Sequence, residues 1–193
     1  MSLAGLLDVI ADDPQLRRAL DAAAFTPGQP AADLSGVAAA GGDLTGPAEL
    51  RPFLTAALTG RAGRFVLAVT ATAREAEDLA DELTSFLPAP TVACFPAWET
   101  LPHERLSPRS DVVGQRLAVL RRLAHPAAVG DPVAGPLSVV VTPVRGLLQP
   151  IVAGLGDLEP VRLTAGQAAD PDEVLTRLVE IGYSRVDLVE KRG

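Results

Sequence analysis

Several residue types that catalytic, metal-binding and secreted proteins depend on are nearly missing from this sequence. Its 193 residues include one cysteine, one lysine, one tyrosine, one tryptophan and two histidines. Because Cys94 stands alone, no internal disulfide can form, which is typical of a protein from a reducing cytoplasm. One cysteine and two distant histidines leave no cluster with metal-ligand spacing, so we expect no metal site. A Gly-x-Ser-x-Gly nucleophile turn is also missing, and we assign no catalytic residue.

Long apolar runs are absent as well. No stretch approaches the about 18–20 uncharged apolar residues that span a membrane, and Asp8 interrupts the apolar start of the chain. We therefore expect no membrane helix, no secretory signal and a cytoplasmic location. The formal net charge of -7 argues against broad, non-specific binding of nucleic acid. Five arginines between Arg105 and Arg122 are interspersed with acids, and we interpret them as a solvated helix face.

What the sequence does contain is an alternation of strand-like and helix-like patterns. Residues 65–70 and 137–142 are nearly continuous apolar runs, as in strands covered on both faces of a sheet, and 91–95 is a shorter strand candidate. After the first run, Thr72 and Glu75 have capping-box spacing, and apolar residues recur at helical spacing up to Phe86. This order predicts an α/β fold, a parallel sheet flanked by helices. The pattern also predicts helices over 3–10, 14–23 and 47–59, the last starting late or kinked at Pro52, and a weak strand over 34–40.

An ordered connection follows the second strand candidate. Three prolines between residues 95 and 108 exclude a continuous helix or central strand there, and we expect Trp98 to be a buried packing anchor. Ser107 and Pro108 predict the N-cap and first position of the next helix. Its predicted apolar stripe is formed by Val113, Leu117, Leu120 and Ala124, and Arg116, Arg121 and Arg122 lie off that stripe.

The pattern breaks in proline and glycine around 149–156, where we predict a domain boundary. The first unit covers residues 1–152 and the second covers 153–193. In the second unit, Asp170 and Pro171 predict a helix start, and Gly182 suits the left-handed position that ends it. Residues 185–189 alternate polar and apolar, as an exposed strand would. One helix and a strand or two cannot close a core, so we expect this second domain to be incomplete and the sequence truncated.

Three blocks in order resemble one known family. They are FPAWETLPHERLSPRSDVVGQRLAVLRRL at 95–123, SVVVTPVRGLLQPI at 138–151 and DEVLTRLVEIGYSRVDLVEKRG at 172–193. The chain resembles the bacterial transcription-repair coupling factors (Mfd), in the amino-terminal module that is similar to the excision-repair helicase UvrB. The resemblance implies a degenerate helicase-like domain over 1–152, followed by the beginning of a small α+β domain that binds the damage-recognition protein UvrA.

The phosphate-binding loop of a working helicase is not intact here. Where the UvrB pattern has Gly-Lys-Thr, this chain has Gly46-Pro47-Ala48. Proline removes the cation and a backbone donor, and alanine removes the Mg²⁺ ligand. We therefore expect no nucleotide cofactor. UvrB-like helicases also carry a tyrosine-rich hairpin that binds DNA by stacking on its bases. This chain has a single tryptophan, Trp98, and a single tyrosine, Tyr183.

The resemblance implies that this segment is non-catalytic and recruits UvrA in transcription-coupled nucleotide excision repair. RNA polymerase and DNA would be bound only by downstream domains, which carry the family's ATP-driven translocase. Within the matching segment, Tyr183, Arg185 and Asp187 are the candidate UvrA-binding residues. Arg185 could instead pair with Asp187 or lie in solvent. Two enzyme hypotheses stay open on the residues: an authentic UvrB-type ATP-dependent helicase fragment and an unrelated small α/β enzyme.

Overall fold

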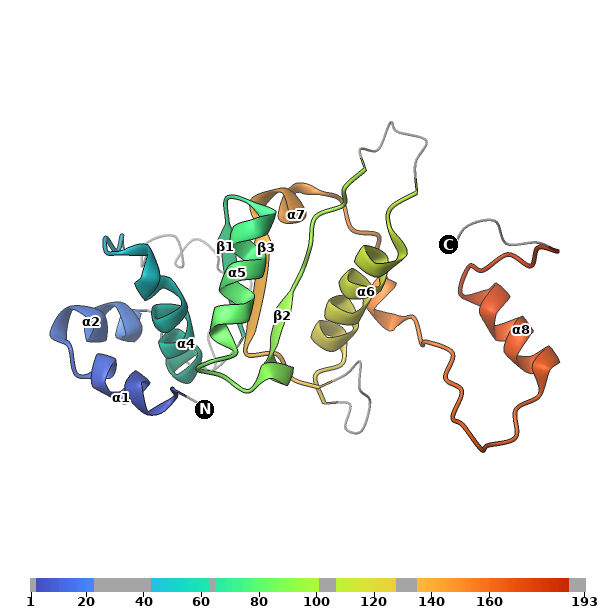
Figure 1. Ribbon diagram of the computed structural model, residues 1–193, viewed down its shortest axis with the longest axis horizontal. Helices are drawn as coiled ribbons and strands as arrows, with labels where there is room; N and C mark the ends of the chain where they lie inside the picture. The colour runs from blue at the N-terminus through green and yellow to red at the C-terminus, as the bar shows by residue number, and fades with distance from the viewer. Residues whose placement is uncertain (1–2, 23–42, 63–64, 101–106, 128–134, 188–193) are drawn as a thin grey trace.

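A three-stranded parallel sheet forms the centre of the computed structural model, which describes residues 3–22, 43–62, 65–100, 107–127 and 135–187. The strands are β1 (Val66–Thr70), β2 (Val92–Cys94) and β3 (Val139–Pro143). Both β1 and β2 pair in parallel with β3, which gives the order β1-β3-β2 (Figure 1). The predicted α/β fold with a parallel sheet flanked by helices is therefore confirmed. The predicted strand over 34–40 lies outside the described residues.

The helices follow the predicted order. Their bounds are α1 (Gly5–Ala11), α2 (Pro14–Ala22), η2 (Ala48–Leu50), α4 (Arg51–Ala62), α5 (Ala73–Leu83), η3 (Ala89–Thr91), α6 (Ser110–Ala124), α7 (Val144–Leu148), η4 (Leu155–Asp157) and α8 (Pro171–Glu180). The capping box at the start of α5 is present, because Glu75 N–H donates to Thr72 Oγ1 and Thr72 N–H donates to the Glu75 carboxylate. Pro52 lies in the first turn of α4, which confirms the late start.

Two apolar clusters hold the sheet between its helices. On one face, α4 and α5 cover Val139 and Val141 of β3, and on the other α6 covers Val140 through Val119. Every residue of β3 is buried, as predicted for a strand covered on both faces. The same prediction is wrong for β1, whose Leu67 and Val69 are 46% and 49% exposed. The reason is the strand order, since α6 packs on β2 and β3 and leaves this side of β1 without a helix among the described residues.

The predicted start of α6 is also wrong. The helix begins at Ser110, with Arg109 as an N-cap residue that makes no side-chain capping bond, so Ser107 and Pro108 precede it. Asp111 then lies in the first turn, where its negative charge favours the helix dipole. The Arg109 guanidinium bonds the same Asp111 carboxylate. A carboxylate inside the first turn thus replaces the predicted serine cap.

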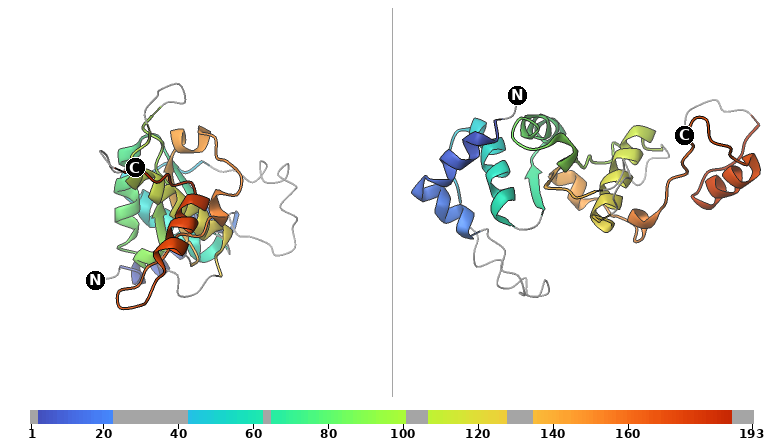
Figure 2. Two further views of the ribbon diagram at one scale, coloured as in Figure 1. Left: turned by 90° about the vertical axis from the view of Figure 1, so that its right-hand side faces the viewer. Right: turned by 90° about the horizontal axis from the view of Figure 1, so that it is seen from below.

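The molecule is long in one direction. Helices α1 and α2 pack against α4 at one end, and α8 lies at the other end after a segment without regular structure (Figures 1 and 2). Between them, η4 packs on α6, where a Cβ on Gly156 would lie 2.8 Å from the carbonyl oxygen of Leu120. No helix in the described ranges is both long and apolar enough to cross a membrane.

Candidate functional site

The connection after β2 is held by a buried arginine. Arg116 of α6 is 2% exposed, and its guanidinium carbon lies 4.1 Å from the ring centroid of Phe95 and 4.3 Å from that of Trp98. Its Nη1 donates to the carbonyl oxygen of Pro96 at 2.6 Å. A planar cation placed between two aromatic faces combines stacking with cation–π attraction. We name Phe95, Pro96, Trp98 and Arg116 the elbow clamp.

A second contact fixes the elbow from the residues after β3. Trp98 N–H donates to Gln149 Oε1 at 2.6 Å, and Gln149 Nε2 donates back to the Trp98 carbonyl at 3.1 Å. The neighbouring helix α7 approaches closely at Gly146, where a Cβ would lie 2.6 Å from Thr142 Oγ1 and 3.4 Å from the Phe95 carbonyl oxygen. These contacts hold residues 95–100, the described beginning of the elbow, in place, and Trp98 is half-buried rather than fully buried.

The arginines of α6 are structural, so the prediction of a solvated basic face is wrong for this helix. Burial lowers the pKa of Arg116 from its usual value, and burial also lowers the pKa of Arg122. Arg122 donates to the carbonyl oxygens of Pro90, Gly135 and Pro136. Arg121 donates to the Leu158 carbonyl oxygen at 3.0 Å and lies 3.9 Å from the Glu159 carboxylate. These long side chains reach backbone carbonyls at segment ends, where strands and helices leave acceptors unpaired.

Two residues of this arrangement were missed by sequence reasoning. Helical periodicity predicts Arg116 off the apolar stripe, yet it lies with Val119 on the face that packs against the sheet. Gln149 lies in the predicted domain boundary, and the sequence pattern assigns it no contact. The available signal was the pair of aromatic rings three residues apart, Phe95 and Trp98, beside a helix rich in arginine, because guanidinium groups stack on aromatic faces.

Gly46-Pro47-Ala48, the degenerate phosphate loop, leads into the short helix η2. Pro47 is its N-cap residue, in an extended conformation and without a side-chain capping bond. The hollow beside it has a volume of about 210 Å³ and is lined by Ala48, Glu49, Arg51, Thr70, Glu75, Asp78, Leu79 and Glu82. Four of these residues are acidic and one is basic. Such a surface repels phosphate groups, which fixed cations and helix N-termini normally bind.

The candidate partner-binding residues follow α8. Its end is a Schellman motif, in which Gly182 N–H donates to the Val179 carbonyl and Tyr183 N–H donates to the Leu178 carbonyl. Gly182 has φ +101°, which confirms its predicted left-handed position. The motif sets the direction in which the chain leaves the helix.

Tyr183, Arg185 and Asp187 are all exposed, and Tyr183 is 61% exposed. Arg185 makes no ion pair with Asp187 within the described segment, so of its two alternative placements the structure shows the solvent one. The predicted strand over 185–189 is wrong for residues 185–187, which have no regular structure, and 188–189 lie outside the described residues. No neighbouring strand edge among the described residues is available to pair with this segment.

The two histidines of the sequence are His103 and His125. His103 and Glu104 lie outside the described residues, as does most of the segment that joins the elbow to α6. His125 caps the end of α6, and its Nε2 lies 3.0 Å from Asp157 Oδ1 in η4. Within the described ranges, no group of three or more His, Cys, Asp or Glu residues is arranged to hold a metal ion.

The fold and these surfaces define a parallel α/β protein whose exposed C-terminal segment, rather than a phosphate-binding cleft, is the candidate site. The sequence matches no protein-family model. It is 53% identical over 152 residues to the transcription-repair-coupling factors of Mycobacterium bovis and Mycobacterium tuberculosis, which covers 78% of this chain and 12% of each relative. It is 29% identical over 146 residues to the transcription-repair-coupling factor of Bacillus subtilis, which covers 74% of this chain and 12% of that protein.

The chain is homologous to a segment of the transcription-repair-coupling factors. This result confirms the family resemblance that the three sequence blocks indicate. The chain spans about 12% of the length of the curated relatives it matches.

Proposed function

We propose that this chain is an adaptor segment of a transcription-repair coupling factor and recruits UvrA in transcription-coupled nucleotide excision repair. In this proposal, residues 1–152 form a degenerate helicase-like domain and residues 153–193 begin the UvrA-binding domain. The observation that carries the proposal is the exposure of Tyr183, Arg185 and Asp187 on a segment whose direction is fixed by the Gly182 motif. Arginine and tyrosine are the residue types that most often dominate protein interfaces.

The same proposal makes the segment non-catalytic. Pro47 and Ala48 replace the cation and the metal ligand of a phosphate loop, and the adjoining hollow is lined by four acids and one arginine. Both features disfavour the helicase alternative, because nucleotide hydrolysis requires charge stabilisation of the phosphates. RNA polymerase and DNA would be bound by other parts of such a factor.

Calorimetric titration with Mg-ATP tests the non-catalytic part of the proposal. We expect no saturable site, because the phosphate-binding cation and the metal ligand are both missing. A site with a Kd below about 100 μM, equivalent to roughly 5–6 kcal/mol, would contradict it. Titration with Mg-ADP is the matched control, since an adenosine pocket without a γ-phosphate site would bind both nucleotides equally.

UvrA binding tests the recruiting role. Two forms are compared by interferometry on immobilised UvrA: the 193-residue chain, and a fusion in which Gly193 is joined to the residues that follow this region in the M. tuberculosis relative. We expect the fusion to bind more tightly, because the described residues of the second unit, 153–187, contain one α-helix and no buried side chain. Arg185→Ala in the fusion should weaken binding by about 2 kcal/mol, roughly thirtyfold.

Arg74→Ala is the matched control, because Arg74 is an exposed arginine on α5, in the first unit. It should leave UvrA binding unchanged. A fusion that does not bind UvrA would overturn the recruiting role. A fusion that binds equally well with Arg185→Ala would remove only this residue from the interface.

A further inference from the structure

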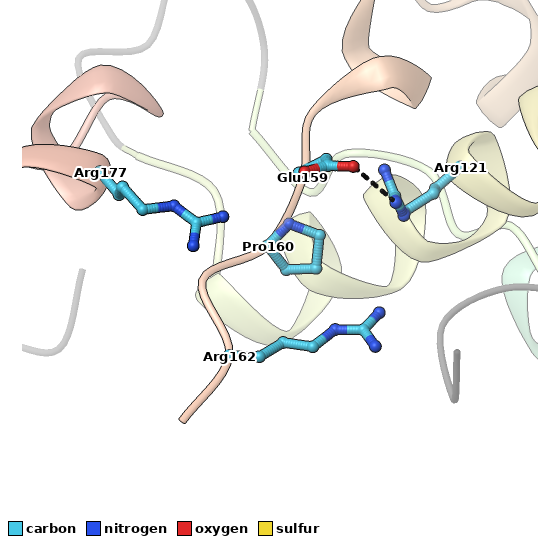
Figure 3. A pocket seen from close by; sticks show the side chains of 5 residues that line it. All are labelled: Arg121, Glu159, Pro160, Arg162 and Arg177. Atoms are coloured by element: carbon cyan, nitrogen blue, oxygen red, sulfur yellow. Dashed lines mark ion pairs between the residues drawn. The ribbon is translucent and has the colours of Figure 1, made fainter. Parts of the chain in front are cut away.

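A basic hollow lies between α6, the segment after η4, and α8. It has a volume of about 320 Å³ and is lined by Arg121, Glu159, Pro160, Arg162 and Arg177. Figure 3 shows that the three arginines come from three different parts of the chain and surround Pro160. Side chains so far apart in sequence converge here because the segment after η4 runs between the two helices.

The charge of this hollow is opposite to that of the whole chain. Three guanidinium groups and one carboxylate line it, whereas the chain has a formal net charge of -7. Arg121 is held in place by the Leu158 carbonyl oxygen and lies 3.9 Å from Glu159. Arg162 and Arg177 are exposed, and Arg177 makes no ion pair with any described residue. Guanidinium groups in this arrangement match carboxylate oxygens through bidentate hydrogen bonds.

An apolar hollow adjoins the basic one. Its volume is about 190 Å³, and it is lined by Gly114, Leu117, Ala118, Arg121, Leu155, Leu158 and Pro160. The two hollows share Arg121 and Pro160, so they form one continuous surface with a basic end and an apolar end. Among the described residues, no aromatic ring lines either hollow, so neither offers the aromatic platform on which single-stranded nucleic-acid bases usually stack.

We propose that this surface docks an acidic segment of a partner protein, with a carboxylate against Arg162 and Arg177 and an apolar side chain against Leu117, Leu155 and Leu158. The three arginines favour a negatively charged ligand by charge complementarity. The adjoining apolar hollow favours a protein segment over a nucleic acid, because a leucine-like side chain fills it and a charged phosphate group does not. The inference does not depend on UvrA recruitment, since it uses neither Tyr183 nor Arg185.

The test is fluorescence anisotropy with a fluorescein-labelled eight-residue peptide in which glutamate and leucine alternate. The chain should bind it saturably, and the double variant Arg162→Glu, Arg177→Glu should weaken binding at least tenfold. Arg145→Glu is the matched control, because Arg145 is an exposed arginine on α7 that lines neither hollow. Leu158→Ser should weaken binding about threefold or more, because it removes part of the apolar end. Circular dichroism checks that each variant keeps the helical content of the unmodified chain.

Two competitors, each compared with the unlabelled acidic peptide, complete the experiment. A peptide with glutamine in place of glutamate should not displace the probe, and an eight-nucleotide single-stranded DNA should displace it only at concentrations at least tenfold above the acidic peptide. Absence of saturable probe binding would overturn the proposal, as would equal binding by the double arginine variant. Displacement by the oligonucleotide at the lower concentration would also overturn it and would assign the surface to nucleic acid.

Discussion

Two arginines, Arg116 in α6 and Arg185 after α8, show how differently two regions of this chain use the same side chain. Arg116 lies between the rings of Phe95 and Trp98, bonds a backbone carbonyl and is 2% exposed. Arg185 is in solvent on a segment without regular structure. The first arginine joins α6 to the elbow through these contacts. The second makes no described contact that would explain its presence structurally.

The contrast separates residues that build the scaffold from residues that are available to a partner. Around the elbow, side chains from α6 and from the end of α7 converge on backbone groups, so a change at any of them disturbs packing. After Gly182, side chains project from a backbone that the Schellman motif alone orients. We therefore expect substitutions at the elbow to change the free energy of unfolding, and substitutions after Gly182 to change partner binding only.

The largest effect on stability is expected at Arg116. Arg116→Ala should lower the free energy of unfolding by about 3 kcal/mol, because it removes a charged hydrogen bond and the contacts with two rings. Arg116→Met keeps much of the side-chain stem and should cost about half as much. Urea denaturation followed by circular dichroism measures both. Arg74→Ala on the surface of α5 is the control and should change stability by less than about 0.5 kcal/mol. Equal stability of all three variants would show that the elbow clamp is not stabilising.

Next in size is the reactivity of Cys94 in β2. Burial, with smaller contributions from Glu77 and Asp81, raises the pKa of this thiol from 9.0 to about 11. The thiolate fraction at pH 8 is then about a hundredfold lower than for a thiol of pKa 9.0, and only the thiolate reacts. We expect Ellman's reagent to react about a hundredfold more slowly with the folded chain than with the chain in urea. Similar rates in both states would show that this face of the sheet is open.

The raised pKa also has a consequence for stability at high pH. The folded state keeps the Cys94 proton up to about pH 11, whereas the unfolded state loses it near 9.0. This group's contribution is therefore fully present below pH 9 and is lost as the pH rises through 11. Cys94→Ser should flatten the fall in melting temperature between pH 9 and 11. An unchanged slope would mean that other groups cause the fall.

A smaller effect is expected at Gly146, where α7 meets the elbow. A Cβ there would lie 2.6 Å from Thr142 Oγ1, so Gly146→Ala should cost about 1–3 kcal/mol. Gly114 in α6 is the matched control, because nothing lies within 4 Å of its Cβ position. Gly114→Ala should stabilise the chain by about 0.5–1 kcal/mol through helix propensity. The opposite order of the two melting temperatures would contradict the close approach of α7.

The smallest effect on stability is expected after α8. Tyr183→Ala and Arg185→Ala should each change the free energy of unfolding by less than about 0.5 kcal/mol, because both side chains are exposed and pack on nothing described. Thermal denaturation checks this directly. A loss above about 1 kcal/mol would show that the segment packs on the rest of the chain, and the contrast with the elbow would then disappear.

Much of the fold follows from local patterns in the sequence. Three predicted features depend only on residues close together in the chain, and each is observed. They are the apolar run of β3, the capping box at Thr72 and Glu75, and the left-handed conformation of Gly182. Strand order cannot be predicted from local pattern. Because β1 is an edge strand, one of its faces is exposed, whereas its apolar run predicts burial on both faces. The buried position of Arg116 depends on rings 18 and 21 residues earlier in the chain, and helical periodicity alone assigns arginine to solvent.

The candidate site also combines features set by local sequence with features set by tertiary structure. The alternating pattern over 185–189 predicts an exposed strand; the exposure of Arg185 is observed, but residues 185–187 have no regular structure. The basic hollow could not be predicted, because Arg121, Arg162 and Arg177 meet only when the segment after η4 runs between α6 and α8. The two hollows are therefore products of tertiary structure, whereas the exposed segment is a product of local sequence.

Hydrogen–deuterium exchange with and without UvrA tests the central claim most directly. In the UvrA-binding fusion, we expect added protection of backbone amides in residues 182–187. The Trp98 amide should be slow to exchange in both states, because it already donates to Gln149. Added protection at the elbow with none at 182–187 would contradict the account, because the partner would then bind the scaffold rather than the exposed segment.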